Sequence, residues 1–217
     1  MTRLAVFDLD GTLVDSAPDI HAALDRLALA RGLAPYSRAE VTAMIGDGVR
    51  VLVERALVAR GQPFGNAALE AFTADYTAHA VDQTALFDGM AECLATLEAA
   101  GWRLAICTNK PAAATAALLD RLGLHGRFAA VGAGDSFPVK KPNPEHLRAT
   151  IAAAGGRRER AVMLGDHRND VMAARGLGVP AVFVRWGYGS AAMAEGAAAQ
   201  ATTPAEIAAL LHGLMPA

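Results

Sequence analysis

The stretch Leu-Ala-Val-Phe-Asp-Leu-Asp-Gly-Thr at residues 4–12 decides the fold of this chain. Its four apolar residues end abruptly in a polar turn, which is typical of a buried parallel strand. Asp8 and Asp10 are two residues apart in an extended segment, so both carboxylates can face one site at the carboxyl end of the strand. Gly11 then allows a sharp exit. A polar turn would explain the two aspartates alone, but the full string favours a functional site, because open parallel sheets bind ligands at these strand ends.

Apolar runs of the same kind recur along the chain at 102–107, 128–131, 161–164 and 181–184. Helical stripes of apolar residues separate them, around 90–97, 118–122 and 207–214. This alternation predicts an α/β fold, in which a parallel sheet is covered by helices on both faces to give a three-layer, Rossmann-like core.

One segment interrupts the alternation. From about Ser16 to Leu86 we find no convincing strand, only helical stripes separated by glycine-containing turns. A helical block inserted after the first strand is best explained as a second, smaller domain over the sheet. We therefore expect a Rossmann-like core domain at 1–15 and 87–217 and a small α-helical domain at 16–86.

The composition fits a globular chain with a sizeable core, since 53% of the 217 residues are hydrophobic and 19% are charged. The net charge of -2 provides no strong field for nucleic acid or an acidic membrane surface. The sequence has no charged-then-apolar leader and no run of about 20 apolar residues. Cys93 and Cys107 are expected to be buried thiols rather than a disulfide or a metal pair. We expect a cytoplasmic protein, monomeric or homodimeric, without nucleic-acid or membrane partners.

Two further strand ends carry polar residues suited to binding phosphate. Thr108 and Asn109 end the second apolar run, where a hydroxyl and the free amides of a helix start could hold a phosphate group, although either residue could simply cap the helix. Lys141 lies in a loop stiffened by Pro142 and Pro144, so its positive charge could be directed at a phosphoryl group. A solvated loop is the alternative explanation for Lys141.

The fourth strand is followed by Asp166 and Asp170, four residues apart. If a helix starts near His167, the two carboxylates lie near one face and could contribute to a magnesium site. An acidic first turn of a helix is the alternative. Each of the four signals has a structural explanation by itself, but a parallel sheet brings all four strand ends to one edge.

With these motifs in this order, the sequence resembles the haloacid dehalogenase superfamily of aspartate-nucleophile phosphatases along nearly the whole chain. The resemblance implies that Asp8 is the nucleophile and Asp10 the general acid and base. It further implies Mg²⁺ as cofactor, held by Asp8, the backbone carbonyl of Asp10, and Asp166, with the helical insertion as a cap that closes over the substrate. The other implied roles are phosphoryl binding by Thr108, charge compensation by Lys141 and support of the metal site by Asp170.

Within the superfamily the chain is most similar to the bacterial phosphoglycolate phosphatases, through residues 8–19, 45–57, 140–142 and 186–189. This implies hydrolysis of a small phosphorylated metabolite, with 2-phosphoglycolate as the favoured substrate. The alternatives are another small phosphate ester or pyrophosphate, phosphoryl transfer as in the related sugar mutases, and a catalytically retired binding or regulatory protein. The intact set of carboxylates disfavours the last.

Substrate choice is expected to reside in the cap. Gly46 and Gly48 would allow close approach of backbone to the ligand, and Arg50 could pair with a substrate carboxylate. Alternatively, Arg50 could form an ordinary surface pair with Glu54, and we favour this surface role. His167 departs from the serine common in the family. It is either a tolerated residue of the first helical turn or an imidazole that contacts substrate or adjusts magnesium affinity.

Overall fold

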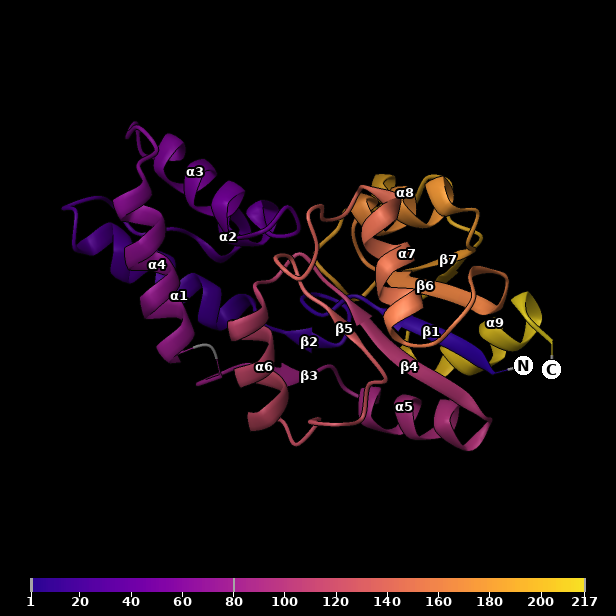
Figure 1. Cartoon of the computed structure of the whole chain (residues 1–217). Helices are drawn as coiled ribbons and strands as arrows, with labels where there is room; N and C mark the ends of the chain where they lie inside the picture. The colour runs from indigo at the N-terminus through magenta and orange to yellow at the C-terminus, as the bar shows by residue number, and fades with distance from the viewer. Residues whose placement is uncertain (1, 80, 217) are drawn as a thin grey trace.

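A computed structural model of the chain describes residues 2–79 and 81–216; residues 1, 80 and 217 of the expected domains lie outside this description. The core is a six-stranded, all-parallel sheet with the strand order β5-β4-β1-β6-β7-β8 (Figure 1). Its strands are β1 (Arg3–Phe7), β4 (Trp102–Cys107), β5 (Val131–Gly132), β6 (Ala161–Gly165), β7 (Ala181–Val184) and β8 (Ala199–Ala201).

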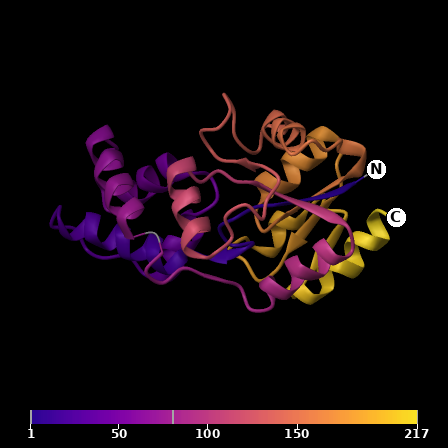
Figure 2. The same cartoon turned by 60° about the horizontal axis from the view of Figure 1, so that its bottom comes forward.

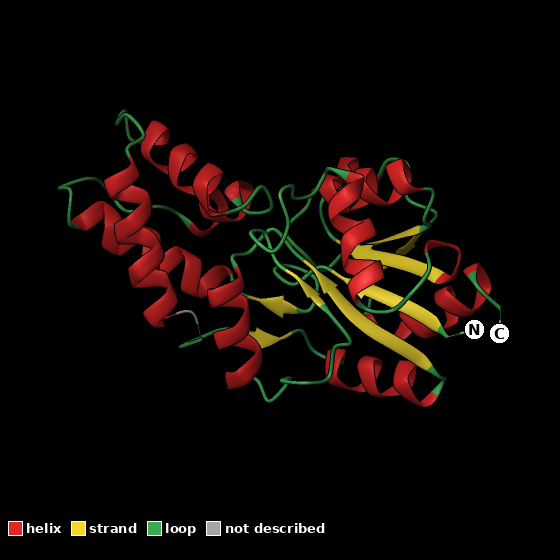
Figure 3. Cartoon of the chain, in the orientation of Figure 1, coloured by secondary structure: helices red, strands yellow, loops and turns green. Residues whose placement is uncertain are grey.

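Helices cover both faces of the sheet, which confirms the predicted three-layer α/β core (Figure 3). On one face the apolar side chains of the strands pack against α5 (Met90–Ala99), α6 (Ala112–Arg121) and α9 (Ile207–Leu214). On the other face they pack against α7 (Pro144–Ala153) and α8 (Arg168–Leu177). Short 3₁₀ turns complete the core at Arg158–Arg160, Ala191–Ala194 and Pro204–Glu206.

Strand β1 lies at the centre of the sheet, which explains its unbroken apolar run. Ala5 and Phe7 contribute to the core on one face and Leu4 and Val6 to the core on the other, so none of these four positions can be polar. The chain runs from β1 outward through β4 and β5, then returns to β6 on the other side of β1. Asp8 follows β1 directly, so it lies where the strand order reverses, the usual ligand site of such sheets.

The segment between β1 and β4 forms a helical block with its own apolar core. Figures 1 and 2 both place this block beyond the carboxyl ends of the strands, on the side away from the two termini. Two short strands, β2 (Val14–Asp15) and β3 (Ala85–Leu86), pair antiparallel and connect the block to the core. The block consists of α1 (Ala17–Leu29), α2 (Arg38–Met44), α3 (Val49–Ala59) and α4 (Asn66–His79).

The return connection is fixed by a buried carboxylate. Asp19 in α1 is 2% exposed and accepts hydrogen bonds from the backbone amide of Thr84 at 2.8 Å and from its hydroxyl at 2.6 Å. The amide of Gln83 also donates to Asp19. Both connections between the block and the core are therefore held in place beside each other.

Three details differ from the sequence-based expectation. The strand expected at 128–131 begins only at Val131, because the chain bends at 128 and 129, even though Ala129 and Ala130 hydrogen-bond to β4. Strand β3 lies inside the segment expected to be wholly helical, and β8 lies in an alanine-rich stretch without strand periodicity.

Cys93 and Cys107 are free and buried, as predicted. Within 2–79 and 81–216, the model contains no helix with the length and apolarity required to cross a bilayer.

Candidate active site

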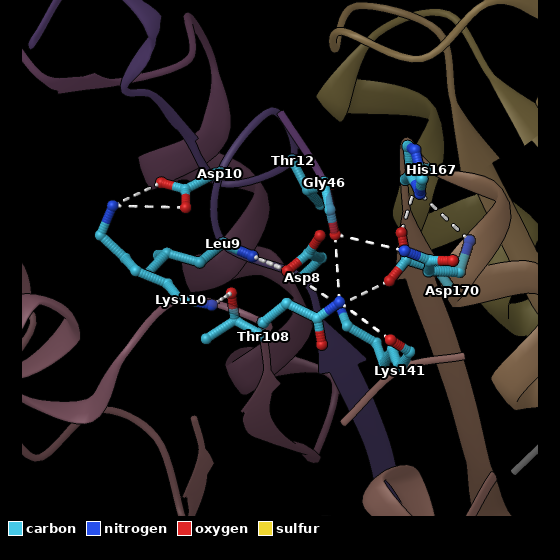
Figure 4. A network of polar contacts seen from close by, with 12 residues as sticks. Asp8, Leu9, Asp10, Thr12, Gly46, Thr108, Lys110, Lys141, His167 and Asp170 are labelled. Atoms are coloured by element: carbon cyan, nitrogen blue, oxygen red, sulfur yellow. Dashed lines mark hydrogen bonds and ion pairs between the residues drawn. The ribbon is translucent and has the colours of Figure 1, made fainter. Parts of the chain in front are cut away.

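Asp8 and Lys141 form a buried ion pair at the centre of the sheet edge (Figure 4). The Lys141 ammonium lies 2.9 Å from Asp8 Oδ1 and 2.6 Å from Asp170 Oδ1, and its side chain is 1% exposed. Burial alone would lower the pKa of Lys141, but the charges of Asp170 and Asp8 outweigh it and raise the pKa. Lys141 is therefore a fixed positive charge beside Asp8. The amide of Leu9 also donates to Asp8 Oδ1, at 2.7 Å.

Three buried carboxylates form a cluster here, and two of them, Asp8 and Asp170, contact Lys141. Oxygen atoms of Asp8, Asp166 and Asp170 lie within 4.8 Å of one another. Burial, and then the negative charge of Asp8, raises the pKa of Asp166 to about 7. Three carboxylates with one lysine carry an excess of negative charge, and oxygen donors are the ligands that hard divalent cations prefer. The residues therefore fit a divalent metal ion. His167 does not belong to this cluster.

Asp166 is positioned by the loop that follows β7. The amides of Tyr188 and Gly189 donate to Asp166 Oδ2 at 2.7 and 3.2 Å, and the Thr12 hydroxyl donates to Oδ1 at 3.2 Å. Gly11 has φ +79°, and a Cβ there would lie 2.5 Å from Asp166 Oδ2. The glycine of the first motif is thus required for the close approach of Asp166 to the end of β1.

Asp10 points away from the carboxylate cluster, toward the helical block. Its Oδ1 accepts a hydrogen bond from the Ser16 hydroxyl at 2.6 Å and lies 2.9 Å from the Lys110 ammonium. Lys110 also contacts the hydroxyl of Tyr76 in α4. Burial alone would lower the pKa of Lys110, but Asp10 and Tyr76 outweigh it and raise the pKa. A charged chain of contacts therefore links the core to the block.

A small cavity of about 60 Å³ lies between the sheet edge and the block. Asp8, Asp10 and Thr108 line it from the core, together with Asn109 and Lys110. Thr108 is 1% exposed and its Oγ1 accepts from the amide of Lys110 at 3.2 Å. Asn109 uses its amide group to donate to the carbonyls of Gly46 at 3.0 Å and Lys141 at 2.9 Å.

The loop between α2 and α3 is seated on the core. Asn169 donates to the Asp47 carboxylate at 2.7 Å and to the Gly46 carbonyl at 3.2 Å. Lys140 Nζ donates to the Asp47 carbonyl at 2.5 Å. His167 is the N-cap of α8, where its Nδ1 accepts from the Asn169 amide at 3.3 Å, and its ring lies against Gly46. The helical block is thus closed over the cavity.

Gly46→Ala is expected to weaken this closure. A Cβ at Gly46 would lie 2.7 Å from the His167 ring, and φ there is +121°, which L-residues rarely adopt. We expect kcat/KM to fall about 10- to 100-fold, equivalent to a cost of about 1–3 kcal/mol for the closed state. Kinetics with a metabolite phosphate ester measure this. Gly46→Ala/His167→Ser should recover part of the loss, because it removes the collision but not the backbone strain. Unchanged kinetics in Gly46→Ala would show that the seated loop is not used in turnover.

The structure brings together most of the residues expected at the site, but not all of them. Gly46 and Gly48 line the cavity. Arg50 does not; it is exposed, and its guanidinium lies over the Phe64 ring at 4.6 Å. Lys110 is not among the residues predicted from the sequence, although it follows Thr108 and Asn109 at the same strand end.

Tyr76 and Tyr188 were also not assigned a role from the sequence. The Tyr188 hydroxyl donates to Asp15 at 2.8 Å and accepts from the amides of Ser16 and Ala17. The sequence does contain a pattern that indicates Lys110. This lysine lies two residues beyond Thr108, so it must be near the same edge of the sheet. The contacts of Tyr76 and Tyr188 join segments that are distant in the sequence, so no local pattern predicts them.

Comparisons with known proteins agree with this geometry. Residues 2–178 match the family model of haloacid dehalogenase-like hydrolases. The chain is 40% identical to the phosphoglycolate phosphatase of Agrobacterium fabrum over 90% of this chain and 85% of that protein. It is 43% identical to that of Caulobacter vibrioides over 84% of this chain and 78% of that protein.

Solved structures give the same result. A predicted phosphoglycolate phosphatase from Haemophilus somnus superposes with a TM-score of 0.88 at 27% identity, covering 96% of this chain and 97% of that chain. CbbY from Rhodobacter sphaeroides in complex with xylulose-(1,5)bisphosphate superposes with a TM-score of 0.81 at 26% identity, covering 95% and 96%.

The fold and the strand-end carboxylates thus define a hydrolase of the α/β class, and the chain belongs to the haloacid dehalogenase-like hydrolase family. Within that family it is a phosphoric monoester hydrolase that resembles the phosphoglycolate phosphatases.

Proposed function

We propose that the chain is a Mg²⁺-dependent phosphatase that hydrolyses 2-phosphoglycolate to glycolate and phosphate through an aspartyl-phosphate on Asp8. The observation that carries this proposal is the ion pair of Asp8 with Lys141 inside a cluster of buried carboxylates, at the edge of a cavity that Asp10 also lines. Both close contacts to Asp8 are made to Oδ1, which supports Oδ2 as the attacking atom.

The residues would divide the reaction between them. Asp8 attacks phosphorus and the bond to the ester oxygen breaks. Asp10, which enters this step protonated, gives its proton to the departing alkoxide. Asp10 then accepts a proton from a water molecule that attacks the phosphorus, and phosphate leaves as the Asp8 carboxylate re-forms. Lys141 offsets the negative charge, while Thr108 and the nearby amides donate to the phosphoryl oxygens.

The metal ion would be held by Asp8, Asp166 and the backbone carbonyl of Asp10, with Asp170 supporting the site. When bound, it lowers the repulsion between the nucleophilic carboxylate and the phosphoryl group. Asp170 suits a supporting role, because its two oxygens accept from Lys141 and from the amide of His167. These two contacts support a position of Asp170 behind the reacting atoms.

We further propose that residues 16–86 act as a cap on a catalytic core of residues 1–15 and 87–217. The separate apolar core of the helical block and its paired connecting strands support this division. A cap of this kind would open to admit a small ester and close to exclude water during phosphoryl transfer. With its free, buried thiols, the enzyme is suited to a reducing compartment such as the cytoplasm.

A panel of phosphorylated metabolites ranked by kcat/KM in the presence of Mg²⁺ tests the substrate. We expect 2-phosphoglycolate to rank first, as the names of relatives at 40% and 43% identity suggest. The second candidate is a phosphorylated sugar, favoured by the sugar bisphosphate bound to CbbY at 26% identity. A sugar phosphate ranking above 2-phosphoglycolate would overturn the substrate but leave the mechanism standing.

The metal proposal predicts a pH dependence of Mg²⁺ binding. The pKa of Asp166 is about 7 in the metal-free fold, well above its usual value near 4. The folded state therefore holds an extra proton between about pH 4 and 7, and the metal-free protein loses stability as the pH rises through this window. Because Mg²⁺ competes with that proton, its affinity should increase about tenfold from pH 6 to pH 8.

Thermal unfolding with and without Mg²⁺ measures this effect. Mg²⁺ should raise the Tm at pH 8 at a lower concentration than at pH 6. Asp166→Asn should lose the response, whereas Glu159→Gln, which changes an exposed carboxylate, should retain it. A response that is equal at the two pH values would contradict the competition with a proton on Asp166.

A further inference from the structure

Lys110 is a second buried lysine at the site, and the mechanism proposed above gives it no task. Its side chain is 3% exposed, and its ammonium lies 2.9 Å and 3.3 Å from the two oxygens of Asp10. It also contacts the Tyr76 hydroxyl. In Figure 4, Lys110 approaches from the side of Asp10, whereas Lys141 approaches from the side of Asp170. The two lysines therefore pair with different carboxylates of the site, Lys110 with Asp10 and Lys141 with Asp8 and Asp170.

Burying a second ammonium is unfavourable unless its partners compensate for the lost hydration. A purely structural task is available, because Lys110 pairs with Asp10 and contacts α4 through Tyr76. That task does not explain why Lys110 belongs to the lining of a cavity rather than to a packed interior. Lys110 lines the cavity together with Asp10 and Tyr76, so a bound ligand can reach it.

The charges around the cavity limit what else could bind an anion. Among the described lining residues, Lys110 is the only lysine or arginine. The helical block contributes mainly apolar side chains, with three hydroxyl-bearing residues from α4. Arg50, the other basic candidate, lies outside the cavity over Phe64. The apolar wall comprises Ile20, Ile45, Val49, Leu52 and Phe72, and the hydroxyls belong to Thr73, Tyr76 and Thr77.

The position of Lys110 matches the position of a carboxylate next to the reacting ester. Asp10 is the proposed proton donor to the ester oxygen, so that oxygen must come close to Asp10. In 2-phosphoglycolate a single methylene separates the ester oxygen from the carboxylate. The carboxylate therefore falls beside Asp10, where the Lys110 ammonium already lies. Tyr76 accepts from Lys110 through its oxygen, which leaves its phenolic hydrogen to donate into the cavity.

We propose that Lys110 is a specificity-determining residue that binds the substrate carboxylate, with the Tyr76 hydroxyl as a second donor. This inference rests on the proposed function and deepens it. The substrate class becomes phosphate esters with a carboxylate one carbon from the ester oxygen. Since Tyr76 belongs to α4, carboxylate binding would also join the helical block to the core in the closed state.

The test compares two esters of nearly equal size, 2-phosphoglycolate and ethyl phosphate, which has a methyl group in place of the carboxylate. Wild-type protein should favour 2-phosphoglycolate in kcat/KM. Lys110→Met keeps the length of the side chain but removes the charge. Because the loss of the Asp10 partner affects both esters alike, the ratio of the two kcat/KM values is the readout. The ratio should fall about 10- to 100-fold, mainly because KM rises for the ester that carries the carboxylate.

Two further variants keep the test decisive. Tyr76→Phe retains the ring and should lower the ratio several-fold even if Lys110→Met does not fold. Arg50→Ala is the matched control, since it removes a basic residue outside the cavity, and it should leave the ratio unchanged. A wild-type ratio in Lys110→Met, or in Tyr76→Phe where Lys110→Met does not fold, would show that the pair is only structural. A fall in the ratio of the two kcat/KM values for Arg50→Ala would instead assign carboxylate binding to Arg50.

Failure of the proposed function gives different results. If wild-type protein hydrolyses both esters equally well, 2-phosphoglycolate is not the substrate, and carboxylate binding by Lys110 is overturned with it. If neither ester releases phosphate, the phosphatase mechanism itself fails. Retention of the preference in Lys110→Met overturns the inference about Lys110 alone.

Discussion

Asp8→Asn is expected to reduce phosphate release by at least about 10⁴-fold, because the amide lacks the nucleophilic oxygen and the negative charge. The substitution preserves the shape of the side chain. The folded structure should therefore persist, and in the absence of metal the variant should be at least as stable as wild type, since it removes one of three clustered buried carboxylates. Phosphate release and thermal unfolding, both measured on the same preparation, check this prediction.

The matched control for Asp8→Asn is Asp15→Asn, which changes the partly buried aspartate of β2 that bonds to Tyr188 and Arg38. It lies outside the cavity lining and should retain turnover within about tenfold. Turnover by Asp8→Asn close to that of wild type would eliminate Asp8 as the nucleophile. Loss of turnover with loss of folding would instead identify a structural role.

Lys141→Met is expected to cost both activity and stability. Removing the ammonium leaves Asp8 and Asp170 buried without their shared partner, and breaking such a pair destabilises proteins by about 3–5 kcal/mol. Turnover should fall by about 10²–10³-fold, because the charge that offsets the phosphoryl group is lost. Denaturant unfolding measures the loss in the free energy of unfolding. EDTA is included so that a bound metal ion does not compensate for the missing charge.

The stability loss in Lys141→Met should depend on pH. Without the lysine, protons bind the buried carboxylates more tightly in the folded state than in the unfolded state. The unfolding free energy of the variant should therefore fall as the pH rises, and the deficit should be larger at pH 8 than at pH 5. Lys141→Met/Asp170→Asn should regain stability but not turnover. A deficit that is independent of pH would contradict the assignment of Lys141 as the charge partner.

The central residues of the site could be predicted from the sequence because each lies next to a strand that its own apolar run identifies. Asp8, Asp10 and Gly11 directly follow a strand whose apolar run requires burial on both faces, and a parallel sheet then brings Thr108 and Asp166 to the same edge. Neither the strand order nor the distances between the paired groups can be read from the sequence.

The rest of the site depends on contacts between distant segments. Lys110 reaches Tyr76, 34 residues earlier in the chain, and no periodicity links the two. Arg50 was a reasonable candidate by charge, but its helix directs it toward Phe64. Strand β8 has only three residues in an alanine-rich stretch, so neither alternation nor β-branched side chains identify it. This segment forms a strand because it pairs with the edge of β7 that β6 leaves free.

The most direct test of the account is to find the phosphoryl group on Asp8 itself. Wild-type protein would be mixed with Mg²⁺ and 2-phosphoglycolate, quenched in acid within the first turnover, digested, and analysed by mass spectrometry. The account predicts one phosphoryl group on the peptide that contains Asp8, absent when Mg²⁺ is omitted and absent in Asp8→Asn. Phosphate release without any phosphorylated peptide, or a phosphoryl group on another residue, would contradict it.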